Sequence, residues 1–209
     1  MTMTPRPVYL YVFDELPDWE TGHATAHINA PMWQREPGRY GVRTVGATTD
    51  PVTTMGGTRI VPDMTLDQVT ADEAAMLILP GGFSYEAEST PHDAVMAKVA
   101  ELMAAGTPVA AICGAIFGLA RAGLLDEVDH TGAAKEYLAM TGYVGGEHYR
   151  DELAVTDRGV ITAGPTEPVA FARHIFAALD LYEPEILDAW YGLYSTGDPA
   201  YFGVLDAAS

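Results

Sequence analysis

The single cysteine of the chain stands where a strand-like run meets a helix-like run. Residues 108–112 (PVAAI) are apolar and β-rich, and residues 114–122 have helical character. Small residues, Ala111 and Ala115, lie two positions before and after Cys113, as a nucleophile elbow requires. A thiol there lies near a helix N-terminus, whose dipole favours the thiolate. We interpret Cys113 as a nucleophile; the alternative is a buried cysteine that packs as a small apolar side chain.

Two further features of the sequence could assist a reaction at the Cys113 sulfur. A strand at residues 76–79 ends in Pro80-Gly81-Gly82, and a glycine pair lets backbone N–H groups approach a ligand closely. One of these groups, together with the N–H of Gly114, could form an oxyanion hole. Glu20 lies in the first turn of the helix after the first strand, where its carboxyl could share a proton with the thiol. Its alternative role is to complement the helix dipole.

The same helix carries a histidine pair. Glu20, His23 and His27 have the spacing i, i+3 and i+7 and share one helix face. His23 is therefore a candidate base for the thiol. His23 and His27 also have the spacing of a metal pair, but no third ligand is evident, so we predict no metal site. The alternative is a partly solvated face or a subunit contact.

The pattern of elements predicts how these residues meet. Strand-like and helix-like segments alternate, which indicates a parallel sheet with helices on both faces. Ligands of such sheets bind beyond the carboxyl ends of the strands, where segments 14–20, 79–83 and 112–115 are expected to lie. The predicted strands are 8–13, 40–45, 76–79 and 108–112, with hairpins in 49–62 and 153–162. The predicted helices are 19–32 (N-cap Asp18), 65–69, 91–105, 114–122, 131–140, 166–179 (cap Thr166) and 185–194, followed by a tail at 195–209.

Composition narrows the classes of function. The chain has 209 residues, 48% of them apolar, with 11 basic and 29 acidic side chains and a net charge of −18. These values exclude a disordered chain and argue against binding to nucleic acid or to an anionic membrane. A single cysteine allows no intrachain disulfide and indicates a reducing, cytoplasmic location. No run approaches the length of a membrane helix, and residues 1–7 lack the apolar core of a signal peptide.

These motifs together resemble a known family. The sequence DWE at 18–20, LPGG at 79–82, AICGA at 111–115 and LARAGLLD at 119–126 is similar to the DJ-1/PfpI superfamily, which has the class I glutamine amidotransferase-like fold. The resemblance covers roughly residues 8–181. It implies an α/β, flavodoxin-like three-layer sandwich: a mostly parallel sheet with helices on both faces and a small β-hairpin addition. It also implies one domain over residues 1–209, with a core at about 8–181, a C-terminal helix and tail at 182–209, and a homodimer.

The resemblance also assigns site roles. Cys113 matches the reactive elbow cysteine, and Glu20 matches the acidic residue that hydrogen-bonds it. Gly82 and Gly114 match the positions whose N–H groups form the oxyanion site. The chain departs from the family at the histidine. Protease-like members have a histidine where this chain has Gly114, and other members have one shortly after the position of Thr131. His130 is the remaining candidate base, and the alternative is that no base is present.

The expected function follows from these roles. We expect a cysteine-dependent enzyme of the hydrolase, amidase or carbonyl- and glyoxal-processing type that acts on a small molecule without a cofactor. The first alternative is a redox sensor or stress-response protein that responds through oxidation of the same cysteine. The second is a glutamine amidotransferase-like ligand-binding domain without turnover.

Overall fold

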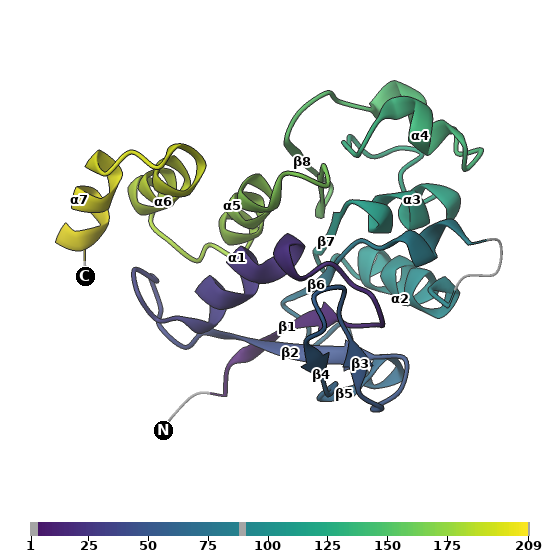
Figure 1. The fold of residues 1–209 in the computed structure, drawn as a ribbon, viewed down its shortest axis with the longest axis horizontal. Coiled ribbons are helices and arrows are strands. Elements are labelled where there is room, and N and C mark those ends of the chain that lie inside the picture. The colour runs from purple at the N-terminus through teal and green to yellow at the C-terminus, as the bar shows by residue number, and fades with distance from the viewer. Residues whose placement is uncertain (1–3, 88–90, 209) are drawn as a thin grey trace.

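A central sheet of seven strands organises the part of the chain that the computed structural model describes, residues 4–87 and 91–208 (Figure 1). Its strand order is β5-β2-β1-β6-β7-β9-β8, and only β8 runs antiparallel to its neighbour. A separate antiparallel hairpin pairs β3 with β4. The predicted mostly parallel sheet with an added hairpin is confirmed. The strands are β1 (Arg6–Tyr11), β2 (Tyr40–Gly46), β3 (Val52–Thr53), β4 (Arg59–Ile60), β5 (Met64–Thr65), β6 (Met76–Leu79), β7 (Val109–Ile112), β8 (Ala154–Asp157) and β9 (Val160–Ala163).

Helices cover both faces of this sheet, which gives three layers (Figure 1). On one side α1 packs against α5, while α2 and α3 lie on the other side. Helix α6 packs on α5 and α7 on α6, so the chain ends at the margin farthest from α2 (Figure 1). The helices are α1 (Asp18–Asn29), α2 (Asp93–Ala104), α3 (Gly114–Arg121), α4 (Lys135–Ala139), α5 (Pro168–Ala178), α6 (Pro184–Thr196) and α7 (Ala200–Ala207). Short 3₁₀ turns are η1 (Leu66–Gln68), η2 (Phe83–Glu86) and η3 (Gly145–His148).

The inner strands are buried along their length. All residues of β6 (MLIL) and β7 (VAAI) are inaccessible to solvent, as expected for parallel strands that are covered on both faces. The same buried cluster continues beyond residue 181 and includes Trp190 and Leu205. The C-terminal helices therefore contribute to the core.

Several predicted boundaries are wrong. Asp18 is not an N-cap: Pro17 holds that position, and the Asp18 carboxylate accepts hydrogen bonds from Thr54 Oγ1 and the Gly56 N–H, both at 2.6 Å. These bonds hold the β3–β4 hairpin against α1. Helix α1 ends at Asn29, before the predicted residue 32. Glu167, not Thr166, stands at the N-cap position of α5.

The C-terminal half shows two larger differences. Of the predicted helix 131–140, only α4 is helical, because residues 130 and 131 instead extend alongside residues 148–152. The predicted tail at 195–209 contains the end of α6 and the whole of α7. The ring of Tyr201 packs directly on Gly192, where a Cβ would overlap it, and this contact seats α7 on α6. Ser209 and residues 1–3 of the predicted non-signal N-terminus lie outside the described residues.

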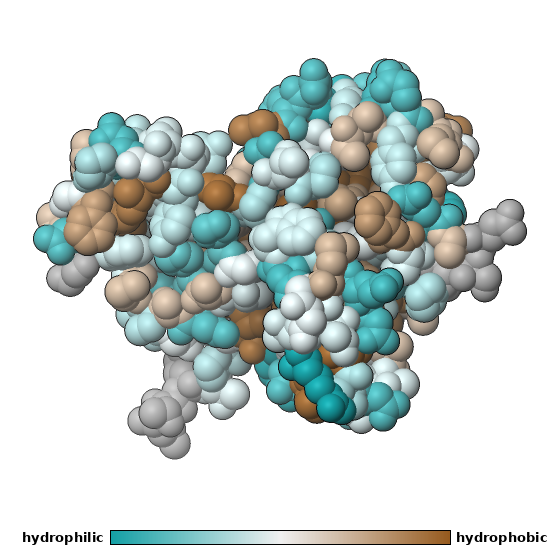
Figure 2. All heavy atoms as spheres, viewed as in Figure 1, coloured by the Kyte–Doolittle hydropathy of each residue, from teal (hydrophilic) through white to brown (hydrophobic). Residues whose placement is uncertain are grey.

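The surface is mixed in character. On the face in Figure 2, apolar side chains form separate patches among hydrophilic ones, and one patch lies over α6 and α7. Within the described residues, no helix combines the length and apolar character needed to cross a membrane.

Candidate active site

Cys113 occupies a sharp corner between β7 and α3. Its backbone has φ 58° and ψ −125°, a left-handed conformation that is strained for a residue with a Cβ. The Cys113 N–H donates to the carbonyl of Ala163 at 3.2 Å, which ties the corner to the neighbouring strand. Ala111 and Ala115 on either side are completely buried. This geometry presents the sulfur at the carboxyl end of the sheet.

Glycines form the wall next to the sulfur because no side chain fits there. A Cβ on Gly81 would lie 2.6 Å from Cys113 Cβ and 3.0 Å from the sulfur. A Cβ on Gly114 would overlap the carbonyl oxygen of Gly82, so these two backbones touch. The backbone after β6 therefore lies so close to Cys113 and Gly114 that a side chain has no space there.

The N–H groups of Gly82 and Gly114 face a shared space. Within the described ranges, neither donates to a protein carbonyl or carboxyl oxygen, and the Gly114 N–H interacts with the Cys113 sulfur. Both residues line one cavity with Cys113. Buried N–H groups are nearly always paired, and two such groups beside a sulfur are what binding of an acceptor oxygen at this position would require.

Glu20 reaches the sulfur from the first turn of α1. Its side chain is 1% exposed, and its Oε2 accepts a 2.6 Å hydrogen bond from the Gly81 N–H. Its Oε1 has no partner of regular hydrogen-bond geometry among the described residues. The carboxyl as a whole interacts with the Cys113 thiol. Burial raises the pKa of Glu20 to about 7, and the hydrogen bonds from Gly81 and Cys113 oppose this rise. Glu20 can therefore exchange a proton near neutral pH.

The thiol is not poised as a free thiolate, contrary to the expectation from the helix dipole. Burial, followed by the nearby Glu20 carboxylate, raises the pKa of Cys113 to about 12. The Gly114 N–H lowers this pKa, but its effect is smaller. Two adjacent negative charges in a buried site repel each other, so the pair retains one proton. Glu20 is consequently a group that can exchange a proton with the thiol.

The cavity around Cys113 has a volume of about 410 Å³. Its rim carries the exposed side chains of Trp19, Met55 and Phe83, which are 54%, 44% and 80% exposed. Glu86 and Tyr137 add a polar corner, where the Tyr137 hydroxyl donates to Glu86 Oε1 at 2.8 Å. Among the described residues, the lining includes no histidine, lysine or arginine. This absence separates the site from a Cys-His dyad.

His23 is not a base for Cys113, contrary to prediction. Its ring lies edge-on to Trp190 and Tyr194 at centroid distances of 6.1 and 5.2 Å, on the side of α1 that faces α6. His27 lies in the same aromatic cluster, where its Nε2 accepts from the indole N–H of Trp190 at 3.2 Å and its Nδ1 lies 3.4 Å from the Tyr182 hydroxyl. Burial lowers the pKa of His27 to about 4. Both rings are used in packing, and no cluster of three metal-ligating side chains occurs in residues 4–87 and 91–208.

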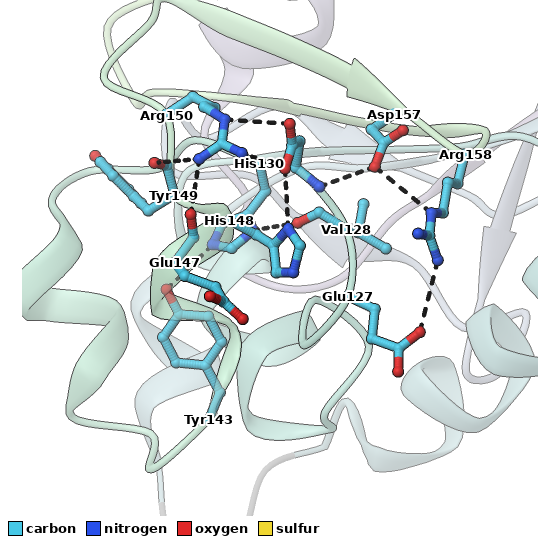
Figure 3. Close-up of polar contacts among 11 residues, drawn as sticks. Glu127, Val128, His130, Tyr143, Glu147, His148, Tyr149, Arg150, Asp157 and Arg158 are labelled. Carbon is cyan, nitrogen blue, oxygen red and sulfur yellow. Dashed lines mark hydrogen bonds and ion pairs between the residues drawn. The ribbon is translucent and has the colours of Figure 1, made fainter.

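His130 is also excluded as the base. It is fully buried, and its Nδ1 bonds the carbonyl of Val128 at 2.7 Å while its Nε2 contacts the Tyr143 hydroxyl at 3.1 Å (Figure 3). Since the Val128 carbonyl only accepts, Nδ1 carries the proton and Nε2 accepts from Tyr143. Both nitrogens are occupied. The His130 N–H donates to the His148 carbonyl, and the His130 carbonyl accepts from the Arg150 N–H. The side chains of His148 and Arg150 in turn bond Asp129.

Sequence patterns did not identify His92, which packs against Phe13, the ring that a Cβ on Gly82 would meet. His92 is fully buried; its Nδ1 lies 3.1 Å from the Tyr11 hydroxyl and its Nε2 lies 2.8 Å from Ser84 Oγ. Its ring stacks on Tyr85 at a centroid distance of 3.9 Å. His92 thereby links β1 to η2, the segment that follows Gly82. No motif marks it, because its partners are distant in sequence.

Comparisons with known proteins show which family and fold the chain shares. The DJ-1/PfpI family model matches residues 6–178. The chain is 37% identical over 203 residues, 96% of each chain, to "Uncharacterized protease YoaZ" of Bacillus subtilis (strain 168). A crystal structure of a thiJ/pfpI family protein from Bacillus anthracis superposes with a TM-score of 0.91 at 36% identity, covering 100% of this chain and 99% of that one. A DJ-1 superfamily protein from Agrobacterium tumefaciens gives a TM-score of 0.80 at 30% identity, covering 93% and 99%.

Proposed function

The chain belongs to the DJ-1/PfpI family, and within that family we propose that it is a cysteine-dependent enzyme acting on small carbonyl compounds. Cys113 is the nucleophile, Glu20 moves the proton, and the N–H groups of Gly82 and Gly114 bind the oxyanion. One observation carries the proposal. The buried carboxyl of Glu20 has one oxygen, Oε1, without a regular hydrogen-bond partner within the described residues, and it interacts with the Cys113 thiol at a cavity that both residues line.

The proposed reaction begins when the substrate carbonyl oxygen accepts hydrogen bonds from Gly82 and Gly114. The sulfur of Cys113 forms a bond to the carbonyl carbon while its proton passes to Glu20, and the carbonyl electron pair moves to the oxygen. With an aldehyde, Glu20 returns the proton to this oxygen and a hemithioacetal results.

With an amide, the tetrahedral intermediate collapses instead. The C–N bond breaks, the leaving nitrogen takes the proton from Glu20, and a thioester remains on Cys113. Water then attacks the thioester with Glu20 as the base, which releases the acid and restores the thiol. A relative bears the name protease, which favours this hydrolytic branch. A cavity of about 410 Å³ suits a small amide or a short peptide end.

Steady-state assays with small amides, esters and aldehydes test the proposal. Cys113→Ala should abolish turnover, and Glu20→Gln should reduce kcat by roughly 10²- to 10⁴-fold, the range for loss of a positioned general base. Glu185→Gln, the same change on the exposed first turn of α6, serves as a matched control and should leave kcat unchanged. Turnover that survives in Cys113→Ala would refute the proposal.

A second candidate function is oxidation sensing through the same thiol. Peroxide would transfer one oxygen to the Cys113 sulfur and leave as water, and a second peroxide would give the sulfinic acid. A protonated Glu20 could then donate a hydrogen bond to the product. The raised pKa of Cys113 opposes this role, because peroxide oxidises the thiolate. A gain of two oxygens at Cys113 under mild peroxide, without turnover of any carbonyl compound, would favour the sensor.

A further inference from the structure

The charged side chains that line the cavity around Cys113 are all acidic. Glu20 and Glu86 both line the cavity, and within the described residues no lysine, arginine or histidine accompanies them there. The protein as a whole carries a net charge of −18. A low-dielectric cleft lined by one sign of charge concentrates ligands of the opposite sign. An anionic substrate would be repelled at this site.

Glu86 is held in place at the cavity wall. The Tyr137 hydroxyl donates to its Oε1 at 2.8 Å, and the Tyr137 ring packs on Phe117 at a centroid distance of 4.9 Å. Burial, followed by the hydrogen bond to Glu86, raises the pKa of Tyr137, so this hydroxyl remains a donor. Among the described residues, this hydrogen bond engages Oε1 of the exposed Glu86 side chain, and Oε2 is open to a ligand.

Aromatic rings complete the surroundings. Trp19, Phe83 and Tyr137 line the same cavity as Glu86. Aromatic faces attract organic cations, and the attraction adds to that of a carboxylate. Glu20, whose carboxyl interacts with the Cys113 thiol, adds a second acidic residue to the same lining. A carboxylate among aromatic rings, beside a nucleophile, is the chemistry that recognises a protonated amine close to a reactive carbonyl.

We propose that this cavity selects carbonyl substrates that bear a protonated amine near the reactive carbon, and that Glu86, held by Tyr137, is the specificity-determining residue. The inference rests on the proposed function and adds the substrate class. Amino-acid amides and short peptides with a free α-amino group have this chemistry. Their N-acetylated analogues have the same carbonyl without the cation and should be poorer substrates.

Thiol-directed reagents of different charge test the selectivity without requiring turnover. Methanethiosulfonates that carry an ethylammonium, a methyl or an ethylsulfonate group modify the same sulfur: a disulfide forms and methanesulfinate leaves. Intact-mass kinetics report Cys113 alone, because it is the only cysteine. The neutral reagent corrects for any change in the thiol itself. We expect the cationic reagent to react fastest and the anionic reagent slowest.

Variants connect this selectivity to Glu86. Glu86→Gln should reduce the cation-to-anion rate ratio by about tenfold, as expected for removing one charge at close range in a partly screened site. Tyr137→Phe should reduce it by a smaller factor, and Glu185→Gln should leave it unchanged. A ratio that is the same in wild type and Glu86→Gln would overturn the inference. The thermal unfolding midpoint of each variant reports that it is folded.

The failures of the two proposals can be distinguished. If Cys113-dependent turnover occurs and N-acetylated substrates react as well as free amines, the selectivity is wrong and the proposed function stands. If the charge ratio depends on Glu86 but no carbonyl compound is turned over, the cation site stands and the proposed function is wrong.

Discussion

Replacing Glu20 with glutamine should stabilise the fold at alkaline pH while removing activity. The carboxyl is 1% exposed and burial raises its pKa to about 7. In the unfolded chain the same group ionises near its ordinary value of 4.5. Glutamine has almost the same shape, can accept the Gly81 N–H through its oxygen, and never ionises.

The magnitude follows from the two pKa values of Glu20. Below pH 4.5 both states are protonated and Glu20 has no linkage effect. As the pH rises from 4.5 to 7, the unfolded state releases the proton while the folded state retains it, so the unfolding free energy falls. Above about 7 the loss is complete. The difference in pKa, at about 1.4 kcal/mol for each tenfold change in the acid constant, gives a loss of about 3 kcal/mol.

The assay is urea denaturation of wild type and Glu20→Gln in steps from pH 4.5 to 8.5. The difference between the two unfolding free energies removes the contributions of other titrating groups. We expect this difference to change by about 3 kcal/mol in favour of the variant between pH 4.5 and 8, with most of the change before pH 7. A difference that is constant with pH would refute the assignment of a raised pKa to Glu20.

Three further comparisons test the packing at the site and in the aromatic cluster around His27. Gly114→Ala, whose Cβ would overlap the Gly82 carbonyl, should lose activity and about 2 kcal/mol of stability in urea titrations, whereas Gly203→Ala, with open space around it in α7, should gain about 0.5 kcal/mol. Cys113→Gly should be more stable than Cys113→Ala by about 1 kcal/mol in unfolding free energy and should unfold at a higher temperature. Glycine adopts the φ of 58° at this position without the strain that a Cβ causes. Burial lowers the pKa of His27 to about 4, so between pH 6.5 and about 4 only the unfolded state gains the proton. In urea titrations over this range, the unfolding free energy of wild type should therefore fall by up to about 3 kcal/mol relative to that of His27→Phe.

Opposite outcomes would contradict these expectations. Equal stability of the two glycine variants would mean that the wall beside Cys113 can move apart. A lower midpoint for Cys113→Gly would place the strain elsewhere, and a pH-independent difference for His27 would mean that water solvates its ring in the folded state.

Local sequence patterns predict those elements whose structure depends on residues close in sequence. The run Met76–Leu79 is apolar at every position and forms the buried strand β6. Residues 153–162 form the β8–β9 hairpin, since a short polar turn leaves few alternatives. The meeting of Glu20, Gly81 and Cys113 followed from parallel topology, which brings the carboxyl ends of strands together.

Contacts between elements that are distant in sequence determine the features that local patterns could not predict. His92 gains its role from Tyr11, 81 residues earlier, and no spacing rule connects them. His23 shares a helix with Glu20, but α6 covers its side of that helix with aromatic rings. The sequence predicts a tail at 195–209, whereas residues 200–207 form α7, which packs on α6 through Tyr201 and Gly192. In each case the partner lies on another element of the fold.

The contact between the Gly82 and Gly114 backbones has a further consequence for how ligands enter. Two main chains in van der Waals contact leave no hinge beneath the sulfur, so the base of the cavity is pre-organised. The cavity then adapts to different ligands through movement of the exposed rings of Trp19 and Phe83 at its entrance. Crystals grown with and without an inhibitor should superpose at the base of the cavity and differ at these two aromatic rotamers.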